Sequence, residues 1–280
     1  MGYTEKDARL VRQKAATVRK NIVEMLPAGK VGHLGGSSSI ADVTAALYFK
    51  HMRVFADPKD PRRDRCVFSK GHAVLAQYAC FAELGYIPRS EFAKLKTIDG
   101  ILQGHPDYEL TPGIEAVTGS LGQGLSISLG MALALKLDGS DSRVFCVIGD
   151  GEQDEGQIWE AAMAAAAKGA DNLCVILDYN GIQATDATKN VLPVGDLKEK
   201  WEAFGWNALP IDGHDAAQIL SALENADRTK GKPTVIIAKT VKGKGFSFAE
   251  NTAAFHNGAM TEEQYAEAVA AIETAEKEAM

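Results

Sequence analysis

The stretch "VIGDGEQDEGQIWEAAMAAAAKGADNLCVILDYNGIQ", from Val147 to Gln183, is the strongest indication of the fold class. It has an apolar run at each end, and each run breaks off into small and polar residues. A segment with the composition of a helix, Gln157 to Lys168, lies between the two runs. Strand, helix and strand in this order predict a right-handed βαβ unit, whose strands end at the same edge of a parallel sheet. Ligands of such folds bind along that edge.

The same alternation continues further along the chain. Strands are predicted at residues 143–150, 172–180, 206–211 and 233–240, and helices at residues 157–168, 197–204 and 216–226. Each strand is apolar on both faces, which is typical of a parallel sheet covered by helices on both sides. We therefore expect a single α/β domain over residues 1–280 with a central parallel sheet. The composition, 46% hydrophobic and 24% charged, is typical of a soluble globular protein.

The first half of the chain is predicted to be helical with long loops. Apolar residues at helical spacing indicate a helix over the first 27 residues, then a Gly-rich loop at 27–39 and a second helix from Ile40 to Met52. The segment "CVFSKGH", residues 66–72, indicates a short buried strand, and residues 125–137 return to a helical pattern. Thr261, with Gln264 three residues later, predicts the start of a final surface helix.

Charge, apolar-run length and cysteine usage exclude several classes of protein. The net charge of −7, without a Lys/Arg cluster, argues against a nucleic-acid partner. The N-terminus lacks the apolar core of a signal peptide, and no stretch of about 18 apolar residues could span a membrane, so we expect a cytoplasmic protein without a membrane partner. Scattered cysteines predict neither disulfides nor a zinc site; they are Cys66, Cys80, Cys146 and Cys174.

Two polar residues at predicted strand ends indicate a metal site. Asp150 ends one strand, and Asn180, 30 positions later, follows the next. A carboxylate, an amide oxygen and a free backbone carbonyl suit Mg²⁺ or Ca²⁺, and Mg²⁺ with few protein ligands completes its shell with phosphate oxygens and water. Gly149 and Gly151 allow phosphate to approach closely, and the following helix directs N–H groups at it. We infer a metal clamp on a diphosphate, although each triplet read alone is also a common turn.

A family resemblance extends this interpretation. The GDG at residues 149–151, followed by Asn180, is the thiamine diphosphate motif, and the chain resembles the diphosphate-binding domain of transketolase. The resemblance covers nearly the whole chain, in ordered segments such as "GHLGGSSSIADVTAALY", "VFSKGHAVLAQYA", "TGSLGQGLSISLGMALA", "GDGEQDEGQIWEA" and "FHNGAMT". It implies the thiamine diphosphate-binding fold, Mg²⁺ with Ca²⁺ as a substitute, and transfer of a two-carbon ketol unit from a ketose to an aldose.

The resemblance also implies roles for individual residues. The implied Mg²⁺ ligands are Asp150, Asn180 and the backbone carbonyl of Ile182. Glu155 matches a buried acid that the family uses to link cofactor sites across its dimer interface, although an acid in the first helical turn is also favoured by the helix dipole. The implied cofactor-binding positions are His72, Gly119, Ser120, Leu121, Gly151, Glu155, Asn180 and His256.

Histidines supply the remaining implied chemistry, because imidazole can hydrogen-bond hydroxyl groups and move protons near neutral pH. By resemblance, His33, His105 and His256 contact the donor sugar, while His72 and His256 reach the diphosphate. His51 is predicted to end a helix and His214 to lie in a turn, so both are left outside the site. The lysines of "AKTVKGKGF" could add positive charge near phosphate but are interpreted as a solvated loop; they are Lys239, Lys242 and Lys244.

The resemblance further implies a second chain. In the family, a glutamate on a pyrimidine-binding domain completes the site, and the present sequence reaches Met280 soon after the first domain. We therefore expect a separate subunit that carries the pyrimidine-binding domain, two copies of each chain, and sugar or sugar-phosphate substrates. Alternatives are a deoxyxylulose-phosphate synthase, a transketolase for a sulfonated or branched sugar, and a non-catalytic module of the same fold.

Overall fold

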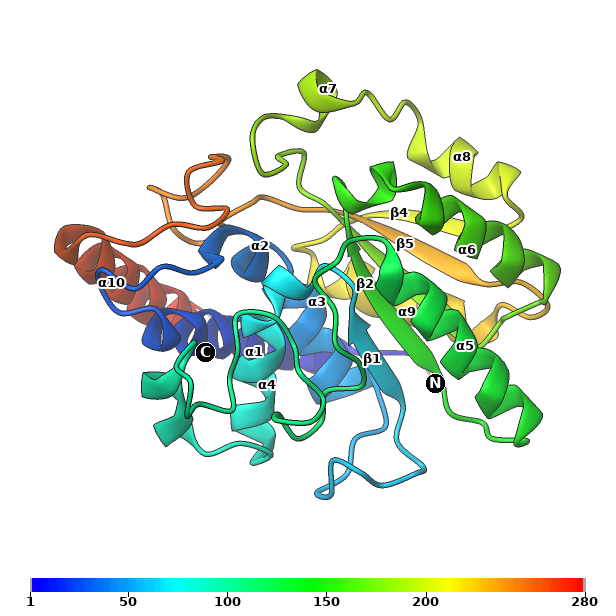
Figure 1. The fold of residues 1–280 in the computed structure, drawn as a ribbon, viewed down its shortest axis with the longest axis horizontal. Helices are drawn as coiled ribbons and strands as arrows, with labels where there is room; N and C mark the ends of the chain where they lie inside the picture. The colour runs from blue at the N-terminus through cyan, green and yellow to red at the C-terminus, as the bar shows by residue number, and fades with distance from the viewer. Residues whose placement is uncertain (1, 279–280) are drawn as a thin grey trace.

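A five-stranded parallel sheet forms the centre of the molecule (Figure 1). The computed structural model describes residues 2–278, and every pair of neighbouring strands in it is parallel. The order across the sheet is β1-β2-β3-β5-β4. The predicted α/β class with a parallel sheet is confirmed. The strands are β1 Arg65–Phe68, β2 Val144–Gly149, β3 Leu173–Tyr179, β4 Asn207–Asp212 and β5 Thr234–Lys239.

Helices cover both faces of the sheet, and two hydrophobic clusters fill the space between the layers. Alternate residues of β2 show the division, because successive side chains of a strand point to opposite faces. Phe145 and Val147 belong to one cluster, and Cys146 and Ile148 to the other. The first cluster includes residues of α1 Glu5–Met25, α3 Ala41–Ala46, α4 Leu75–Leu84, α9 Ala216–Arg228 and α10 Glu262–Glu278, and the second those of α5 Gln123–Leu137, α6 Gly156–Ala167 and α8 Leu197–Ala203.

The starts of the two terminal helices follow the usual capping chemistry. Thr4 and Asp7 form a reciprocal capping box at the start of α1. At the start of α10, the Gln264 amide donates to the Thr261 hydroxyl at 3.2 Å, and the Thr261 amide donates to the Gln264 side chain at 3.0 Å. Each box satisfies backbone N–H groups that have no partner within the helix. The prediction of a capped final helix is confirmed.

The Gly-rich segment at residues 27–39 was predicted to be a loop over its whole length, and the structure differs from this prediction. Its second half forms a buried helix, α2 Leu34–Ser39. Gly and Ser are poor helix formers on their own, but here the small residues allow tight packing. A side chain at Gly35 would place its Cβ 2.9 Å from the Phe255 carbonyl oxygen, and the Ser38 hydroxyl donates back to the Leu34 carbonyl at 2.7 Å. Tertiary contacts therefore stabilise this helix.

The helical pattern predicted from Ile40 to Met52 is confirmed, but its second half is a π-helix rather than an α-helix. After α3 the chain continues as a π-helix, η1 Leu47–His51. The Thr44 hydroxyl donates to the Ile40 carbonyl at 2.8 Å, a bond that competes with the regular ladder, and the Met52 amide reaches the Leu47 carbonyl at 2.9 Å. Further short helices are η2 Gly71–Ala73, η3 Arg89–Lys94, η4 Glu152–Asp154 and α7 Thr188–Val191.

Over residues 2–278, none of the helices combines the length and the apolar character that crossing a membrane requires. The four cysteines are free thiols, and all of them are buried.

Candidate functional site

A cavity of about 300 Å³ lies where β2 and β3 end. Its wall combines residues from several separate parts of the sequence, including the turn after β2 and the loop after β3. Ser120 and Glu155 are predicted site residues that the cavity wall does not include, and both are exposed. The predicted residues that do line it are His33, His72, His105, Gly119, Leu121, Asp150, Gly151, Asn180, Ile182 and His256.

Hydrogen bonds fix the two predicted metal-binding loops to one another. One Asp150 carboxylate oxygen accepts from the Gly181 amide at 2.6 Å and from the Thr188 hydroxyl at 3.1 Å, and its other oxygen accepts from the Gly151 amide at 2.9 Å. The Asn180 side-chain oxygen accepts from the Ile182 amide at 3.1 Å. The turn after β2 is thereby held against the loop after β3, as the βαβ argument requires.

The electrostatics around Asp150 favour a cation. Burial, together with the negative charge of Asp178, raises the pKa of the Asp150 carboxyl. A positive ion beside Asp150 would lower this pKa again, since an opposite charge favours the ionised form of a carboxyl group. Among residues 2–278, no cluster of three His, Cys, Asp or Glu side chains is arranged to hold a metal. The oxygen set of one carboxylate, one amide and one carbonyl is instead of the kind that Mg²⁺ or Ca²⁺ accepts.

Lys242 places a positively charged group beside the predicted metal ligands. Its Nζ donates to the carbonyl oxygens of Ile182 at 2.9 Å and Gln183 at 2.8 Å, and it lies 3.0 Å from Nδ1 of His256. Only 2% of Lys242 is exposed, and burial lowers its pKa to about 8. The interpretation of Lys242 as part of a solvated loop is wrong, whereas Lys239 is exposed and Lys244 partly exposed. The Lys242 ammonium thus contacts the carbonyl of Ile182, one of the predicted metal ligands.

A second buried lysine was not predicted from the sequence. Lys70 follows β1 and forms an ion pair with Asp178, which lies inside β3 and is fully buried. Asp178 also accepts from the hydroxyls of Ser39, at 2.5 Å, and Thr240, and from the Asn180 side-chain amide at 3.1 Å. Burial alone would raise the pKa of Asp178, but Lys70 and these hydrogen bonds lower it. Asp178 therefore holds Asn180 in place. The feature of the sequence that could have indicated this role is a charged residue inside an otherwise apolar strand.

Four histidines meet at the wall of the cavity. The ring centroid of His33 lies 5.3 Å from that of His72, 5.8 Å from His105 and 5.6 Å from His256, and the His72 and His256 centroids are 4.8 Å apart. Burial and nearby positive charge lower the pKa of His33 to about 3 and that of His256 to about 4. Both imidazoles are therefore neutral at pH 7 and can donate one hydrogen bond and accept another.

The loop around Gly119 is shaped by backbone constraints. Gly119 has φ +133°, in the region that favours glycine, and a Cβ there would lie 2.5 Å from the His105 ring. The buried Glu152 carboxylate holds the neighbouring Gly122 amide at 2.9 Å and the Gly149 amide at 3.1 Å, so one side chain joins this loop to the end of β2. Glu152 is thus the buried acid of this turn, and Glu155 faces outward in the single chain. The sequence alone does not distinguish the two.

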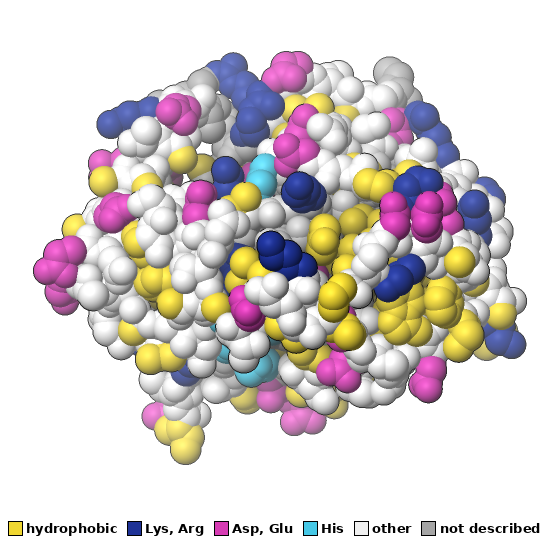
Figure 2. Space-filling model, turned by 90° about the horizontal axis from the view of Figure 1, so that it is seen from above, with side chains coloured by type: hydrophobic (Ala, Val, Ile, Leu, Met, Phe, Trp, Pro, Cys, Tyr) yellow, Lys and Arg dark blue, Asp and Glu magenta, His cyan; other side chains and the backbone are white. Residues whose placement is uncertain are grey.

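The surface around this end of the sheet carries mixed charge. Basic and acidic side chains are interspersed on the face seen in Figure 2, rather than gathered into one field of a single sign.

Comparisons with known proteins agree with this geometry. The family model described as the thiamine diphosphate-binding domain of transketolase matches residues 11–277. A 6-deoxy-6-sulfo-D-fructose transketolase subunit of Clostridium sp. (strain MSTE9) is 46% identical over 266 residues, which are 94% of this chain and 96% of the relative. An apulose-4-phosphate transketolase subunit of Phocaeicola vulgatus is 44% identical over 252 residues, 90% of this chain and 89% of the relative.

Longer transketolases match over a part of their length. The enzyme of Rattus norvegicus is 38% identical over 260 residues, 91% of this chain and 41% of that protein. The crystal structure of transketolase from Campylobacter jejuni has a TM-score of 0.85 and 32% identity, and it covers 95% of this chain and 42% of that one. The crystal structure of a transketolase variant from Pichia stipitis has a TM-score of 0.85 and 30% identity, and the match covers 92% of this chain and 40% of that one. The chain therefore spans about two fifths of these longer proteins.

The fold and the cavity define a thiamine diphosphate-binding α/β domain. The chain belongs to the transketolase family and is a transferase of the transketolase type, which acts by thiamine diphosphate-dependent ketol transfer. The relatives named above are transketolases, a finding that favours this activity over the deoxyxylulose-phosphate synthase alternative.

Proposed function

We propose that this chain is the cofactor-anchoring subunit of a two-chain transketolase that requires Mg²⁺. The observation that carries the proposal is the convergence of Asp150, Asn180, the Ile182 carbonyl and four histidines on one cavity at the ends of β2 and β3. Parallel α/β folds bind their ligands at that edge. The chain matches almost the whole length of relatives that are themselves named as subunits, which supports a division of the enzyme between two polypeptides.

In this proposal the metal is held by Asp150, Asn180 and the carbonyl of Ile182, and Ca²⁺ can replace Mg²⁺ because both accept oxygen ligands. The Gly151 backbone and the side chains of Asn180 and His72 would hold the diphosphate. Lys242 adds a positive charge beside it, since its ammonium already contacts the Ile182 carbonyl. The backbone of Gly119, Ser120 and Leu121 would hold the aminopyrimidine part of the cofactor.

Thiamine diphosphate, when bound, supplies a nucleophilic carbon and the electron sink that allows a ketose to be cleaved. The chain's own contribution is to bind and orient. His33, His105 and His256 contact the sugar hydroxyls, and the lowered pKa values of His33 and His256 keep these rings neutral so that each can donate and accept. Neutral rings also avoid placing positive charge beside the cationic groups of Lys70 and Lys242.

We infer that the partner subunit carries the pyrimidine-binding domain and that two copies of each chain assemble. Glu155 supports this arrangement, because it is exposed in the single chain at a position that the family resemblance assigns to a dimer interface. A partner at this surface would bury Glu155 and complete the cofactor site. The isolated chain is then expected to be inactive.

A specific class of substrate is favoured by the comparisons. The two relatives above with 46% and 44% identity are named for 6-deoxy-6-sulfo-D-fructose and for apulose 4-phosphate, whereas the general transketolase of Rattus norvegicus shares 38%. We therefore propose, as a second candidate, a donor or acceptor sugar that is sulfonated or branched. This candidate differs from an ordinary transketolase only in the sugar that the complete enzyme prefers.

The test uses the chain alone and the chain copurified with its complementary subunit. Ketol transfer is assayed with thiamine diphosphate, Mg²⁺ and in turn fructose 6-phosphate, 6-deoxy-6-sulfo-fructose and apulose 4-phosphate as donors. Activity is expected from the complex alone, with loss on chelation and recovery on adding Mg²⁺. Full activity of the isolated chain would contradict the division into subunits, and calorimetry without any cofactor binding by the complex would contradict the function itself.

A further inference from the structure

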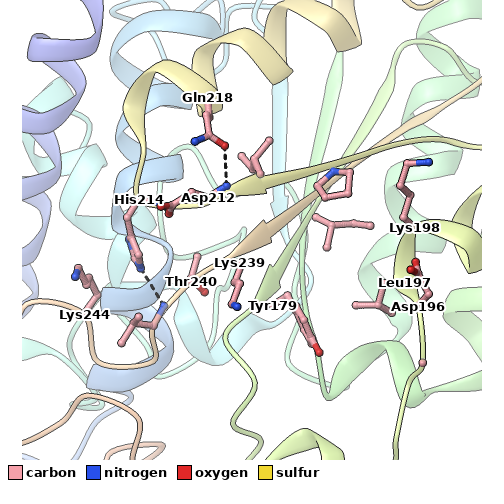
Figure 3. Close-up of a pocket in the computed structure, with 15 residues that line it drawn as sticks. Tyr179, Asp196, Leu197, Lys198, Asp212, His214, Gln218, Lys239, Thr240 and Lys244 are labelled. Atoms are coloured by element: carbon pink, nitrogen blue, oxygen red, sulfur yellow. Dashed lines mark hydrogen bonds between the residues drawn. The ribbon is translucent and has the colours of Figure 1, made fainter.

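His214 lies outside the cavity at the ends of β2 and β3, but hydrogen bonds join it to the loop that carries Lys242. It follows β4 in a turn, and its ring forms part of the wall of a second, larger cavity at the ends of β4 and β5 (Figure 3). Its Nε2 accepts from the Val241 amide at 2.9 Å, and its Nδ1 lies 2.8 Å from a carboxylate oxygen of Asp42. Val241 directly precedes Lys242, whose ammonium donates to the carbonyl of Ile182, a predicted metal ligand.

The partners of His214 determine its tautomer. The Val241 N–H is a donor, so Nε2 must carry a lone pair, and the proton is on Nδ1, where it is donated to Asp42. Burial alone would raise the pKa of Asp42, but the Arg19 charge and hydrogen bonds from His214 and Arg19 lower it to about 2. Asp42 is therefore an anion that orients the imidazole of His214. The oriented imidazole in turn accepts the hydrogen bond from the Val241 amide.

Arg19 closes the network from the other side. Its Nη2 contacts an Asp42 carboxylate oxygen at 2.5 Å, and its Nε donates to the carbonyl of Lys244 at 3.1 Å. The loop that leaves β5 is thus fixed before and after Lys242, by His214 at Val241 and by Arg19 at Lys244. The two anchors share one carboxylate, Asp42, which is on helix α3.

The loop needs these anchors because of its conformation. Gly243 and Gly245 adopt φ +77° and +95°, and a Cβ on Gly243 would lie 2.3 Å from the Ala249 carbonyl oxygen. Fixing the backbone of each residue costs conformational entropy, which anchoring hydrogen bonds offset. Between exposed Lys239 and partly exposed Lys244, the anchored loop turns Lys242 inward.

We propose that His214 is a positioning residue for cofactor binding: it holds the Val241 amide so that the Lys242 ammonium is presented at the diphosphate-binding corner. The inference rests on the proposed function for its consequence, but the loop contact itself can be measured in the chain alone. His214 acts through Lys242, because its own hydrogen bonds join it to Asp42, Asp212 and Val241 rather than to the metal ligands or the sugar-binding histidines.

The first experiment measures amide hydrogen exchange of residues 240–246 in the full chain. His214→Phe keeps the ring volume but removes both nitrogens, so the Val241 amide should exchange about three- to tenfold faster, the range that one net hydrogen bond supports. His214→Gln retains an acceptor near the Nε2 position and should recover part of the protection. His51→Gln is the matched control, because His51 is also hydrogen-bonded and packed, with the Tyr3 hydroxyl 2.7 Å from its Nδ1, but is joined to a different part of the fold. Unchanged exchange in His214→Phe overturns the proposal.

The second experiment tests the coupling in the complex with the complementary subunit. His214→Phe should weaken thiamine diphosphate binding about three- to tenfold in the presence of Mg²⁺, with a smaller effect on kcat. In a Lys242→Met background the same substitution should change the affinity less than about twofold, because residues acting through one group are not additive. An undiminished penalty in that background overturns the proposal. A wild-type complex that binds no thiamine diphosphate would contradict the proposed function, while the exchange result would still decide whether His214 holds the loop.

Discussion

Two cavities lie at the carboxyl ends of the strands, and they differ in size and in what lines them. The larger one, about 920 Å³, is open and lies beside β4 and β5; the smaller, about 300 Å³, lies beside β2 and β3. The larger cavity is lined by exposed lysines such as Lys198 and Lys239. The smaller one is lined by two lysines that are 2% exposed, Lys70 and Lys242.

Buried charge, rather than volume, distinguishes the candidate site from the larger cavity. Burying an ion costs several kcal/mol unless partners compensate for it, so a protein retains such groups where they serve a purpose. In the smaller cavity each buried charge has a defined partner, as Lys70 has in Asp178. In the larger cavity, Lys198 pairs with Glu202 on an exposed helix surface, where such pairs contribute little.

The largest effect is expected from Asp178→Ala. This substitution leaves Lys70 buried without its counter-ion and removes three other hydrogen bonds, and breaking a buried pair costs about 3–5 kcal/mol. Urea unfolding should show that loss of stability. The control is Asp171→Ala, just before β3, because its ion pair with Lys136 is more exposed and should cost at most about 2 kcal/mol with its amide bond. Equal losses in the two variants would contradict the contrast between buried and exposed charge.

Asp150→Ala is expected to have the next largest effect, and we predict it for cofactor binding. Removing an outer partner of a metal site costs about 10- to 100-fold, so removing a direct ligand should lower Mg²⁺-dependent cofactor binding by more than about 100-fold. Calorimetry of the complex with thiamine diphosphate at several Mg²⁺ concentrations measures this. Asp141→Ala, at the opposite end of β2 and paired with Arg53 on the surface, should bind like the wild type. Wild-type affinity in Asp150→Ala would remove the metal assignment.

Lys242→Met should weaken thiamine diphosphate binding about tenfold, because a charge-assisted contact worth about 1.5 kcal/mol is lost while the aliphatic stem is retained. Lys244→Met, two residues away and partly exposed, is the control and should change the affinity less than about twofold. If both variants weaken binding equally, the effect arises from general positive charge around the loop rather than from the buried ammonium.

The pH dependence of stability gives a smaller effect with a definite sign. His33 has a pKa of about 3 in the folded chain, below its usual value of about 6.5, so between these values the unfolded state binds a proton that the folded state does not. This contribution to stability is fully present above pH 6.5 and is lost as the pH falls toward 3. Urea unfolding from pH 7 to pH 4.5 should therefore show a shallower decline in His33→Gln than in the wild type. Parallel declines in the two proteins would contradict the shifted pKa of His33.

Lys198→Ala should have the smallest effect. Its pair with Glu202 is about half exposed on both sides, so the thermal unfolding midpoint should stay essentially that of the wild type and cofactor affinity should change by less than about twofold. Thermal unfolding and calorimetry measure the two quantities. A tenfold loss of affinity would mean that the larger cavity belongs to the cofactor site after all, and the contrast between the cavities would fail.

Much of the site was visible in the sequence because its signals are local. Asp150 and Asn180 stand at the ends of apolar runs, and a βαβ unit brings such ends together whatever the rest of the fold does. Helix α2 was missed because Gly and Ser are poor helix formers, and its stability comes from the segments packed around it, such as Phe255. The burial of Lys242 was missed because Lys239 and Lys244 beside it look the same in the sequence and face outward.

The order of residues along the chain was enough to predict the alternation of strands and helices, the parallel sheet and the edge at which the candidate residues gather, because these follow from periodicity and from where apolar runs stop. Which charges are buried depended instead on the folded arrangement. Lys70 meets Asp178 across 108 positions, and Asp42 meets His214 across 172. Contacts over such separations depend on how whole elements pack, and no local pattern of residues records that packing.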